Sequence, residues 1–312
     1  DAYTGIKENI DVTVAYLTIQ SENGSANCIV NALNSNDHVF DVQSDYVNIT
    51  GFTVENATES YKAGIYLNGS EHCNISNNNA SSNNRGIYMD SSSNNTLTNN
   101  TASNNSNGIW LASSSNNTLT NNTASNNNLG IFLASSNNNT LTNNTANSNK
   151  FGIWLGSSSN NTLTNNTANS NINYGIICLG SSNNILYHNN LINNTDYNAY
   201  DSGTNQWNTS TVGNYYSDYT GSDNDSDGIG DTSYQIPGER NIDYFPLMHP
   251  WEKTPLKGDL DGDSQITSKD ATIALQIAVG SRPLDSAADM NGDCRVTSLD
   301  ALIILQMAAG VC

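Results

Sequence analysis

The sequence has little positive charge and no long apolar run. Its 312 residues contain 10 Lys and Arg against 29 Asp and Glu, which gives a formal net charge of −19. A chain this acidic does not attract nucleic-acid phosphates through general electrostatics, so we expect no nucleic-acid partner. No stretch approaches the roughly 18 consecutive apolar residues of a transmembrane helix, so we expect no membrane span. The length suffices for one large or two smaller domains.

The acidic residues are unevenly distributed. Residues 218–312 hold 16 of the 29 acids, while residues 64–195 contain only Glu71 and Asp90. Carboxylates that cluster near Gly and Asn are typical of sites for divalent cations. The C-terminal part of the chain is therefore the place to look for bound metal.

Several features favour a secreted product. The chain begins with Asp1 and not with Met, which predicts that a leader has been removed. Sequons of the form N-x-S/T are abundant, and together they favour an extracellular glycoprotein at the cell surface. The candidate glycosylation sites are Asn48, Asn56, Asn68, Asn74, Asn99, Asn121, Asn143, Asn165, Asn193 and Asn208.

The middle of the chain repeats itself. The stretch NNTLTNNTAS occupies residues 94–103 and again 116–125, and it recurs twice more with one residue changed. A short alternating strand such as GIWL follows glycines spaced 22 residues apart, at Gly64, Gly86, Gly108, Gly130 and Gly152, with Gly175 after 23. Two further inward positions follow in each period, as at Leu97 and Ala102. Three short strands per period exclude helical repeats, and the period is too short for propeller blades.

This pattern predicts a right-handed parallel β-helix with three strands per coil. Successive coils stack at about 4.8 Å, so like residues form inward ladders such as Ile65 to Ile153. Asn residues also recur in register, which predicts that side-chain amides bond along the axis. We expect the coil to begin near Val12.

The repeats, together with SANCIVNALNSNDHVF and DYVNITGFTVENAT, resemble NosD-like β-helix proteins, which are common in surface proteins of methanogenic archaea. The segment 198–251, with GNYYSDYTGSDNDSDGIGD and NIDYFPLMHPW, resembles the part that closes such helices. The resemblance implies a β-helix over residues 1–200 and a capping segment and linker over 201–257. NosD itself is linked to copper delivery, but the four Met and four His here are scattered singly. We therefore do not transfer a copper role.

The capping segment has two notable features. Its aromatic residues are expected to cover the open last coil, because uncovered strand edges invite pairing between chains. They are Trp207, Tyr215, Tyr216, Tyr219, Tyr234, Tyr244, Phe245 and Trp251. The loop DNDSDGIGD has carboxylates at Asp223, Asp225, Asp227 and Asp231, a density that suits Ca²⁺. The alternative is a solvated acidic turn.

Two twelve-residue loops lie thirty residues apart near the C-terminus, DLDGDSQITSKD at 259–270 and DMNGDCRVTSLD at 289–300. Each has oxygen ligands at positions 1, 3 and 5 and Asp at position 12, and each runs into an apolar helix. Asp at position 12 without an entering helix is not the EF-hand pattern. The unit resembles a type I dockerin, which implies a small α-helical calcium-binding domain over 258–312. The implied calcium ligands are Asp259, Asp261, Asp263, Gln265 and Asp270, then Asp289, Asn291, Asp293, Arg295 and Asp300, with carbonyl groups supplied by Gln265 and Arg295.

The resemblance also implies a partner. Dockerins bind cohesin modules largely through loop positions 10 and 11, which here are Ser268 and Lys269, then Ser298 and Leu299. The two pairs differ, so we do not expect equal use of both faces. A partner within the chain or a neighbouring subunit stays open.

The five cysteines are an odd number, so at least one is free or pairs with another chain. Cys28, Cys73 and Cys178 lie among apolar strand residues and are expected to act as small buried hydrophobes. Cys294 and Cys312 are separated by a helix about 18 Å long, which disfavours a bond between them. An inter-chain or interdomain disulfide is the alternative.

Catalysis is a minority interpretation. The titratable residues on the regular coils do not repeat in register; they are Glu71, His72, Arg85, Asp90, Lys150 and His188. The most suggestive pair, Arg85 and Asp90, is interpreted as a surface salt bridge. By contrast, one aromatic residue per coil should form a continuous outer column, the interaction stripe Tyr66, Tyr88, Trp110, Phe132 and Trp154. Such a stripe could bind a polysaccharide by ring stacking, or another subunit.

The favoured hypothesis is a non-enzymatic, calcium-stabilised structural protein of the cell surface. It would be a self-assembling subunit of an extracellular filament, sheath or S-layer-like coat. The alternative is a carbohydrate-binding or carbohydrate-processing module that its dockerin attaches to a cohesin-bearing scaffold.

Overall fold

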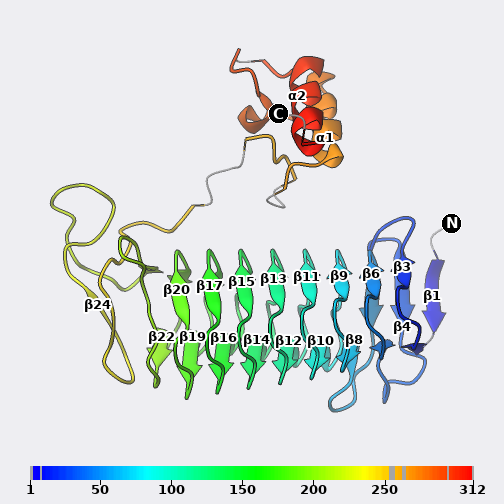
Figure 1. The fold of residues 1–312 in the computed structure, drawn as a ribbon, viewed down its shortest axis with the longest axis horizontal. Helices are drawn as coiled ribbons and strands as arrows, with labels where there is room; N and C mark the ends of the chain where they lie inside the picture. Colours follow the sequence, from blue (N-terminus) through cyan, green and yellow to red (C-terminus); the bar gives the residue numbers. More distant parts are fainter. Residues whose placement is uncertain (1–2, 8, 253–256, 262–264, 294, 311–312) are drawn as a thin grey trace. The chain divides into compact units, whose positions relative to one another are not determined.

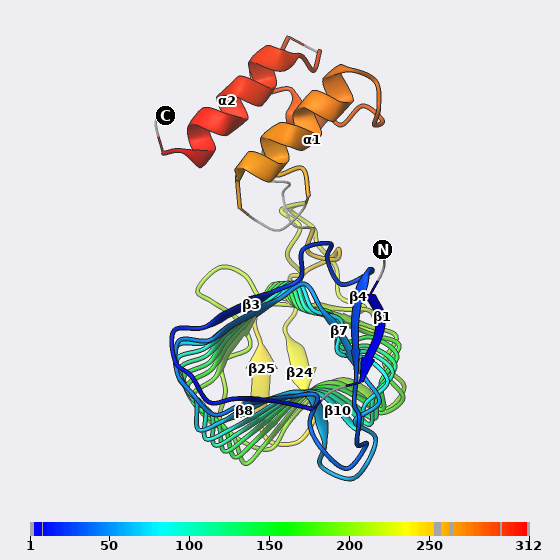
Figure 2. The same cartoon turned by 90° about the vertical axis from the view of Figure 1, so that its right-hand side faces the viewer.

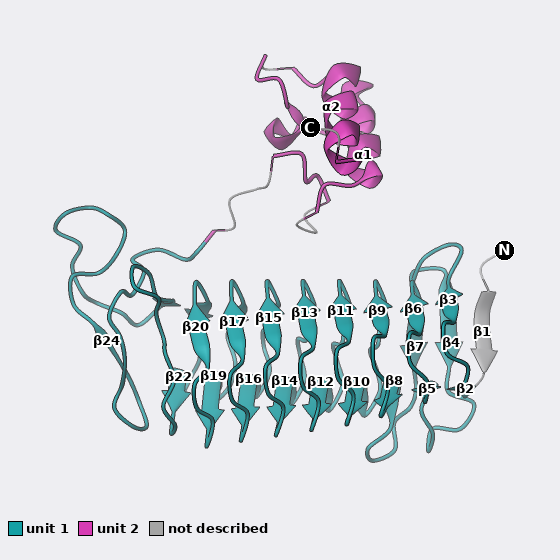
Figure 3. Cartoon of the chain, in the orientation of Figure 1, with its two compact units in different colours: residues 1–251 teal, residues 252–312 magenta. Residues whose placement is uncertain are grey.

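The computed structural model describes residues 3–7, 9–252, 257–261, 265–293 and 295–310, with the backbone alone for 3–7. It divides into two compact units, residues 1–251 and residues 252–312 (Figure 3).

The first unit is a coil of short parallel strands, which confirms the predicted fold class (Figure 1). A nine-stranded sheet forms one face, in the order β2 (Ile10–Val12), β5 (Phe40–Val42), β8 (Ala63–Asn68), β10 (Arg85–Asp90), β12 (Asn107–Ala112), β14 (Leu129–Ala134), β16 (Phe151–Gly156), β19 (Tyr174–Leu179) and β22 (Tyr197–Asp201). An eight-stranded sheet forms the second face, in the order β20 (Ile185–Tyr187), β17 (Thr162–Thr164), β15 (Thr140–Thr142), β13 (Thr118–Thr120), β11 (Thr96–Thr98), β9 (Asn74–Ser76), β6 (Asn48–Thr50) and β3 (Thr18–Gln20).

The third face is less regular. It contains β1 (Tyr3–Lys7), β4 (Cys28–Asn31) and β7 (Thr53–Glu55) at one end, and β18 (Thr167–Asn169), β21 (Asn190–Ile192) and β23 (Tyr215–Tyr216) at the other. Single bridges such as Thr101↔Thr123 connect the coils between them. Because β1 pairs with β4 and β2 starts at Ile10, the coil begins earlier than the expected Val12.

The core of the coil is built from the predicted ladders. Ile65, Ile109 and Ile153 are fully buried, as are Leu97 and Ala102 on the other two faces. The repeated glycine sits at the corner where stacked backbones come closest. A Cβ on Gly86 would lie 2.7 Å from the carbonyl oxygen of Gly108, so no larger residue fits this corner.

Buried asparagines bridge one coil to the next, as predicted from their register. Asn122 shows the pattern: its Oδ1 accepts from the backbone N–H of Asn100 at 3.0 Å, and its Nδ2 donates to the carbonyl of Leu97 at 2.9 Å and to Oδ1 of Asn144 at 3.0 Å. The preceding residue of each NN pair, such as Asn99 with φ 55°, makes the left-handed turn instead. In each pair, therefore, the first Asn shapes the corner and the second satisfies buried backbone groups.

The C-terminal end of the coil is capped. Trp207 and Tyr216 are buried in the same core, and the indole N–H of Trp207 donates to Oδ2 of Asp201 at 2.8 Å. The antiparallel hairpin of β24 (Tyr234–Ile236) and β25 (Asn241–Asp243) lies across this end (Figure 2). The expectation that every aromatic residue of this segment covers the last coil is wrong for Tyr244, whose side chain is 60% exposed.

The second unit contains α1 (Ser268–Ala278), the short 3-10 helix η1 (Ser286–Ala288) and α2 (Ser298–Ala308). Ala271, Ala274, Ala301 and Ile304 form its small core. Each helix begins with a capping box, in which Thr267 pairs with Asp270 and Thr297 with Asp300. Within the described residues, no helix is both long and apolar enough to cross a membrane.

Candidate binding face and calcium loops

The five stripe residues form one column on the outer face of the nine-stranded sheet, which we call the aromatic lane. Tyr66, Tyr88, Trp110, Phe132 and Trp154 are register partners on adjacent strands. Their neighbouring ring centroids lie 5.0, 5.9, 5.1 and 5.0 Å apart. All five side chains are half-buried, so each ring keeps part of its surface open to solvent.

The rings of the aromatic lane are not equivalent. Tyr66 and Tyr88 lie nearly parallel, at an interplanar angle of 9°, so they cover each other's faces. From Trp110 onward the angles are 63°, 54° and 44°, and neighbouring rings do not cover one another in this way. A Cβ on Gly156 would meet the Phe132 ring at 3.4 Å and Nε1 of Trp154 at 3.6 Å, because both rings lean over this glycine. Trp110, Phe132 and Trp154 are therefore the part of the lane whose rings are partly exposed and not stacked parallel on their neighbours.

A second column, formed by the residue before each glycine, widens this face. Phe151 lies 5.1 Å from the ring of Trp154 and 5.8 Å from that of Tyr174, and Tyr174 continues to Tyr197 at 5.9 Å. The sequence analysis missed these residues. Aligning the position before each glycine in the 22-residue period would have found them.

The aromatic lane begins beside an imidazole. His38 stacks on Tyr66 with 4.3 Å between ring centroids, and its Nδ1 accepts a hydrogen bond from the N–H of Ala63 at 3.1 Å. Burial, together with the positive charge of Lys62, lowers the pKa of His38 to about 4. The imidazole is therefore neutral near pH 7.

Arg85 lies beneath aromatic rings and not in the surface salt bridge that the sequence suggested. Its side chain is only 2% exposed, and its Cζ lies 4.0 Å from the ring centroid of Tyr88, 3.9 Å from Trp110 and 4.7 Å from Tyr61. Among the described residues, Arg85 and Asp90 form no ion pair, because the Asp90 carboxylate accepts from the hydroxyls of Tyr88 and Ser91 at 3.1 Å each. The salt-bridge interpretation is therefore wrong, and burial lowers the pKa of Arg85.

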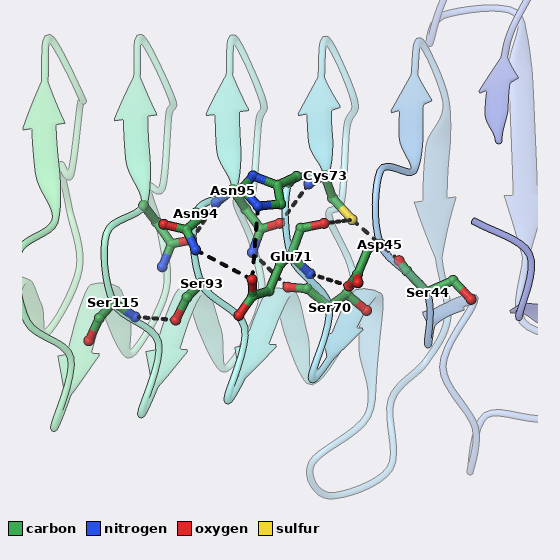
Figure 4. A network of polar contacts seen from close by, with 11 residues as sticks. Ser44, Asp45, Ser70, Glu71, Cys73, Ser93, Asn94, Asn95 and Ser115 are labelled. Carbon is green, nitrogen blue, oxygen red and sulfur yellow. Dashed lines mark hydrogen bonds and ion pairs between the residues drawn. The ribbon is translucent and has the colours of Figure 1, made fainter. Parts of the chain in front are cut away.

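Of the remaining titratable residues of the coils, Glu71 and His72 lie 3.9 Å apart, and Lys150 and His188 lie elsewhere on the coil. Glu71 lies on a turn, where its N–H donates to Asp45 at 2.8 Å and its carboxylate faces Asn94 at 3.5 Å (Figure 4). His72 stacks on Tyr46, and His188 stacks on Trp251 at 3.4 Å. Lys150 lies over Phe151 at 5.5 Å.

The first C-terminal loop brings three of its implied calcium ligands together. Carboxylate oxygens of Asp259, Asp261 and Asp270 lie within 4.8 Å of one another. Asp270 also accepts from the N–H of Leu260 at 2.7 Å and from that of Thr267 at 2.8 Å, so it ties the loop to the helix. Like charges this close repel, and an all-oxygen donor set is the kind that Ca²⁺ prefers. The donor set therefore fits calcium. Gln265 is exposed, and Asp263 lies outside the described residues.

The second loop is ordered in the same way around Asp300. Its carboxylate accepts from the N–H groups of Met290 at 2.9 Å and Thr297 at 2.8 Å. Asp289 accepts from Gly292 at 2.8 Å, and the side chain of Asn291 contacts that of Asp293 at 3.1 Å. Asp293 also accepts from the N–H of Arg295 at 2.9 Å. Within the described residues, its aspartates do not approach as closely as those of the first loop.

The acidic loop of the capping segment gathers three of its four carboxylates. Asp223, Asp225 and Asp227 have oxygens within 4.8 Å of one another. Asp231 faces elsewhere, since its Oδ2 accepts from the N–H of Asn224 at 2.8 Å. Asp225 and Asp227 are exposed, which also suits the solvated turn.

The thiols and sequons complete the set of predicted sites. Cys73 and Cys178 are buried in the coil and Cys28 packs against the core, while Cys294 and Cys312 lie outside the described residues. Every candidate glycosylation asparagine has at least a partly exposed side chain.

The chain belongs to the family described as periplasmic copper-binding protein (NosD), which it matches over residues 6–221. Residues 257–307 match the type I dockerin domain, so the C-terminal unit is a dockerin, a class of domain that binds calcium and cohesins. Both resemblances read from the sequence are confirmed. A comparison with curated proteins gives no match.

Among solved structures, the chain is similar to the periplasmic alginate epimerase AlgG, with 23% identity over 48% of this chain and 38% of that one and a TM-score of 0.42. It is also similar to pectate lyase Pel9A, with 16% identity over 68% of this chain and 62% of that one and a TM-score of 0.45. A third is the A-module of the mannuronan C-5 epimerase AlgE6 of Azotobacter vinelandii, at 13% identity over 63% and 86% of the two chains and a TM-score of 0.38. The chain spans less than two thirds of the first two structures.

Proposed function

We propose that this protein is an extracellular or periplasmic polysaccharide-binding module that its dockerin attaches to a cohesin. The observation that carries the proposal is the aromatic lane, where Trp110, Phe132 and Trp154 are partly exposed on the outer face of the sheet and are not stacked parallel on one another. Flat apolar ring faces along a rigid sheet suit the apolar faces of successive sugar rings. The proposal contains no catalytic step.

The dockerin supplies attachment, and its two helices are unlike. On α2, the outward positions are Leu299, Leu302 and Leu305, each about half exposed. The equivalent positions of α1, thirty residues earlier, are Lys269, Thr272 and Leu275. Three exposed leucines on α2 against one on α1, Leu275, favour docking through α2, with Ser298 and Leu299 at its start, over docking through Ser268 and Lys269.

Calcium is the proposed resident ion of both dockerin loops, with a third ion at Asp223, Asp225 and Asp227. When bound, it neutralises carboxylates that otherwise repel one another. The family description names copper, which prefers imidazole and sulfur ligands. Here the described groups able to hold a metal consist of aspartates, and three of the four imidazoles stack on separate aromatic rings. The residues do not fit a copper site, and we propose no copper role.

A second candidate is self-assembly into a filament, sheath or S-layer-like coat. The N-terminal end of the coil favours it, because β2 and β3 are the terminal strands of their sheets. Tyr16, which is 79% exposed, stacks on Tyr46 at 4.6 Å and leaves a ring at this end for a further partner. Sedimentation with and without EDTA tests this candidate, and a monomer under both conditions would contradict it.

A glycan array tests the binding proposal. We expect the protein to bind a defined set of polysaccharides and Trp110→Ala and Trp154→Ala to lose that binding. Tyr244→Ala is the matched control, because it removes an exposed aromatic ring outside the aromatic lane. Binding that survives both tryptophan substitutions, or no binding to any glycan, would overturn the proposal.

A further inference from the structure

We infer that Arg85 and the rings around it form a subsite for the carboxylate of an acidic sugar, which we call the Arg85 site. The inference rests on the proposed polysaccharide binding and adds the class of sugar. It places one negatively charged unit of the polysaccharide at the N-terminal end of the aromatic lane.

The guanidinium of Arg85 is buried, and it forms no ion pair with a carboxylate of the described residues, although Asp90 lies nearby. Its Nε and Nη1 are both buried and make no hydrogen bond within the described part of the chain. The rings of Tyr88 and Trp110 attract the cation, and the Tyr88 hydroxyl, which donates to Asp90, is one nearby oxygen, but Nε and Nη1 still lack an acceptor. A buried cation whose N–H donors lack acceptors costs free energy. Its presence at this position therefore points to an acceptor supplied from outside the chain.

Tyr61 forms a removable cover over this cation. Its side chain is 69% exposed, and its ring centroid lies 4.7 Å from Cζ of Arg85. Tyr61 precedes β8 and has φ 68°, a conformation that is uncommon for a bulky residue. Its backbone is held by a hydrogen bond to Oδ1 of Asn84 at 3.0 Å. Because the ring is exposed, it can rotate away without disturbing the core and uncover the guanidinium.

The chemistry of the Arg85 site selects a carboxylate on a sugar. Guanidinium groups pair with carboxylates through charge-assisted hydrogen bonds. Along the aromatic lane, the rings of Trp110, Phe132 and Trp154 lead away from Arg85 and carry no charge. Apolar sugar faces can stack there while one carboxylate reaches the cation. Asp90, which follows Tyr88 by two residues, offers an acceptor for sugar hydroxyls.

The test is isothermal titration with oligomers of polygalacturonate, alginate and chondroitin, each beside its carboxyl-reduced, neutral counterpart. We expect at least one acidic oligomer to bind the full-length protein about tenfold or more tightly than its neutral form, the size of a charge-assisted hydrogen bond. Arg85→Gln should bind both forms with the weaker, equal affinity. Arg240→Gln, which removes an exposed cation from the capping segment, is the matched control and should keep the preference.

Two further variants separate the possible failures. Trp154→Ala should lose binding of both forms. If the wild-type protein binds none of these oligomers but binds another glycan on the array, the Arg85 site is overturned; if it binds no glycan on the array either, the proposed function itself fails. If acidic and neutral forms bind the wild-type protein alike, or if a folded Arg85→Gln keeps the preference, the Arg85 site is overturned while polysaccharide binding stands. Should Arg85→Gln not fold, Tyr61→Ala decides: removing the cover should tighten acidic binding about threefold, without change for neutral forms. Equal affinity of Tyr61→Ala and wild type for the acidic form would overturn the Arg85 site.

Discussion

The coil and the dockerin both repeat a short polar unit, but they satisfy their buried polar groups in different ways. In the coil, a carboxamide such as that of Asn122 both accepts from the coil before it and donates to the coil after it. In the first dockerin loop, Asp259, Asp261 and Asp270 bring carboxylate oxygens within 4.8 Å of one another. Neutral side-chain amides pair with one another as hydrogen-bond donor and acceptor, whereas neighbouring carboxylates repel one another. We therefore expect the coil to be stable without a cation and the dockerin to need one.

The largest expected effect is that of removing calcium. With EDTA in excess, we expect residues 252–312 to lose their helices, because the loop carboxylates then repel one another and the ion pair of Lys269 with Asp261 at 2.8 Å offsets only part of this repulsion. The melting transition of the coil should move by no more than about 2 °C, because the ion proposed at Asp223, Asp225 and Asp227 lies in an exposed loop outside the core of the coil. Far-UV circular dichroism and calorimetry of the full chain measure both. Loss of the coil's melting transition in EDTA would show that the coil also depends on calcium.

The next effect separates the two asparagines of one NN pair. Asn100 is buried, and its side chain satisfies the carbonyl of Ile75 at 2.8 Å and the N–H of Asn78 at 3.1 Å. Asn100→Ala leaves both groups unpaired, so we expect a loss of about 3–5 kcal/mol in the free energy of unfolding. Asn99→Gly, which keeps the left-handed turn, should change it by less than about 0.5 kcal/mol. Urea unfolding measures the free energy of unfolding of both variants. Similar losses in the two would show that the buried Asn side chains do not stabilise the coil.

A third effect concerns the carboxylate that the coil does bury. Asp243 is fully buried in the cap, where it accepts from the N–H of Asn214 at 2.7 Å and the hydroxyl of Tyr216 at 3.0 Å. Burial raises the pKa of Asp243 from 3.8 to about 6, against the opposing effect of these hydrogen bonds. The protonated form is thus favoured in the folded state, and its contribution is complete below pH 3.8 and is lost as pH rises through about 6.

This change amounts to about 3 kcal/mol of coil stability between the two pH values. Asp243→Asn lowers stability throughout but should remove this part of the pH dependence. Urea midpoints measured from pH 3.5 to 7.5 test it. A variant with the same slope as the wild type would contradict the assignment to Asp243.

The smallest effect distinguishes the two dockerin helices. Leu302→Ala on α2 should weaken capture of a cohesin about tenfold, the value of one buried leucine contact. Thr272→Ala at the equivalent position of α1 should change the affinity less than about twofold. Surface plasmon resonance against a panel of recombinant type I cohesins measures both. Equal losses from the two variants would mean that the helices are used alike.

The repeated part of the fold could be predicted from the sequence because its information is periodic. Leu97 and Ala102 recur at fixed positions, so strand, core and stacking direction follow from the 22-residue period alone. The surroundings of Arg85 could not be predicted in this way. Tyr61 lies in an irregular loop, and only folding places its ring over a cation 24 residues away in sequence. A local pattern of Arg85 and Asp90 favours a salt bridge, and aromatic contacts across coils replace it.

The candidate sites also divide into those that share the 22-residue period and those that do not. The aromatic lane was predicted because it shares the coil's period, while the second column, with Phe151 and Tyr174, changes identity from coil to coil and was missed. In the cap, Trp207 and Tyr244 are both aromatic but differ in burial, since Trp207 is fully buried and Tyr244 is exposed. That difference depends on the path of the chain after the last coil, which no repeat specifies.

The central claim is that the coil binds polysaccharide in the absence of calcium, whereas the dockerin binds a cohesin only when calcium is present. The most direct test immobilises a glycan bound by the full-length protein and adds a labelled cohesin, with calcium and then with EDTA. We predict that the protein stays on the glycan under both conditions and recruits the cohesin only with calcium. Release from the glycan by EDTA, or cohesin recruitment that survives EDTA, would contradict the claim.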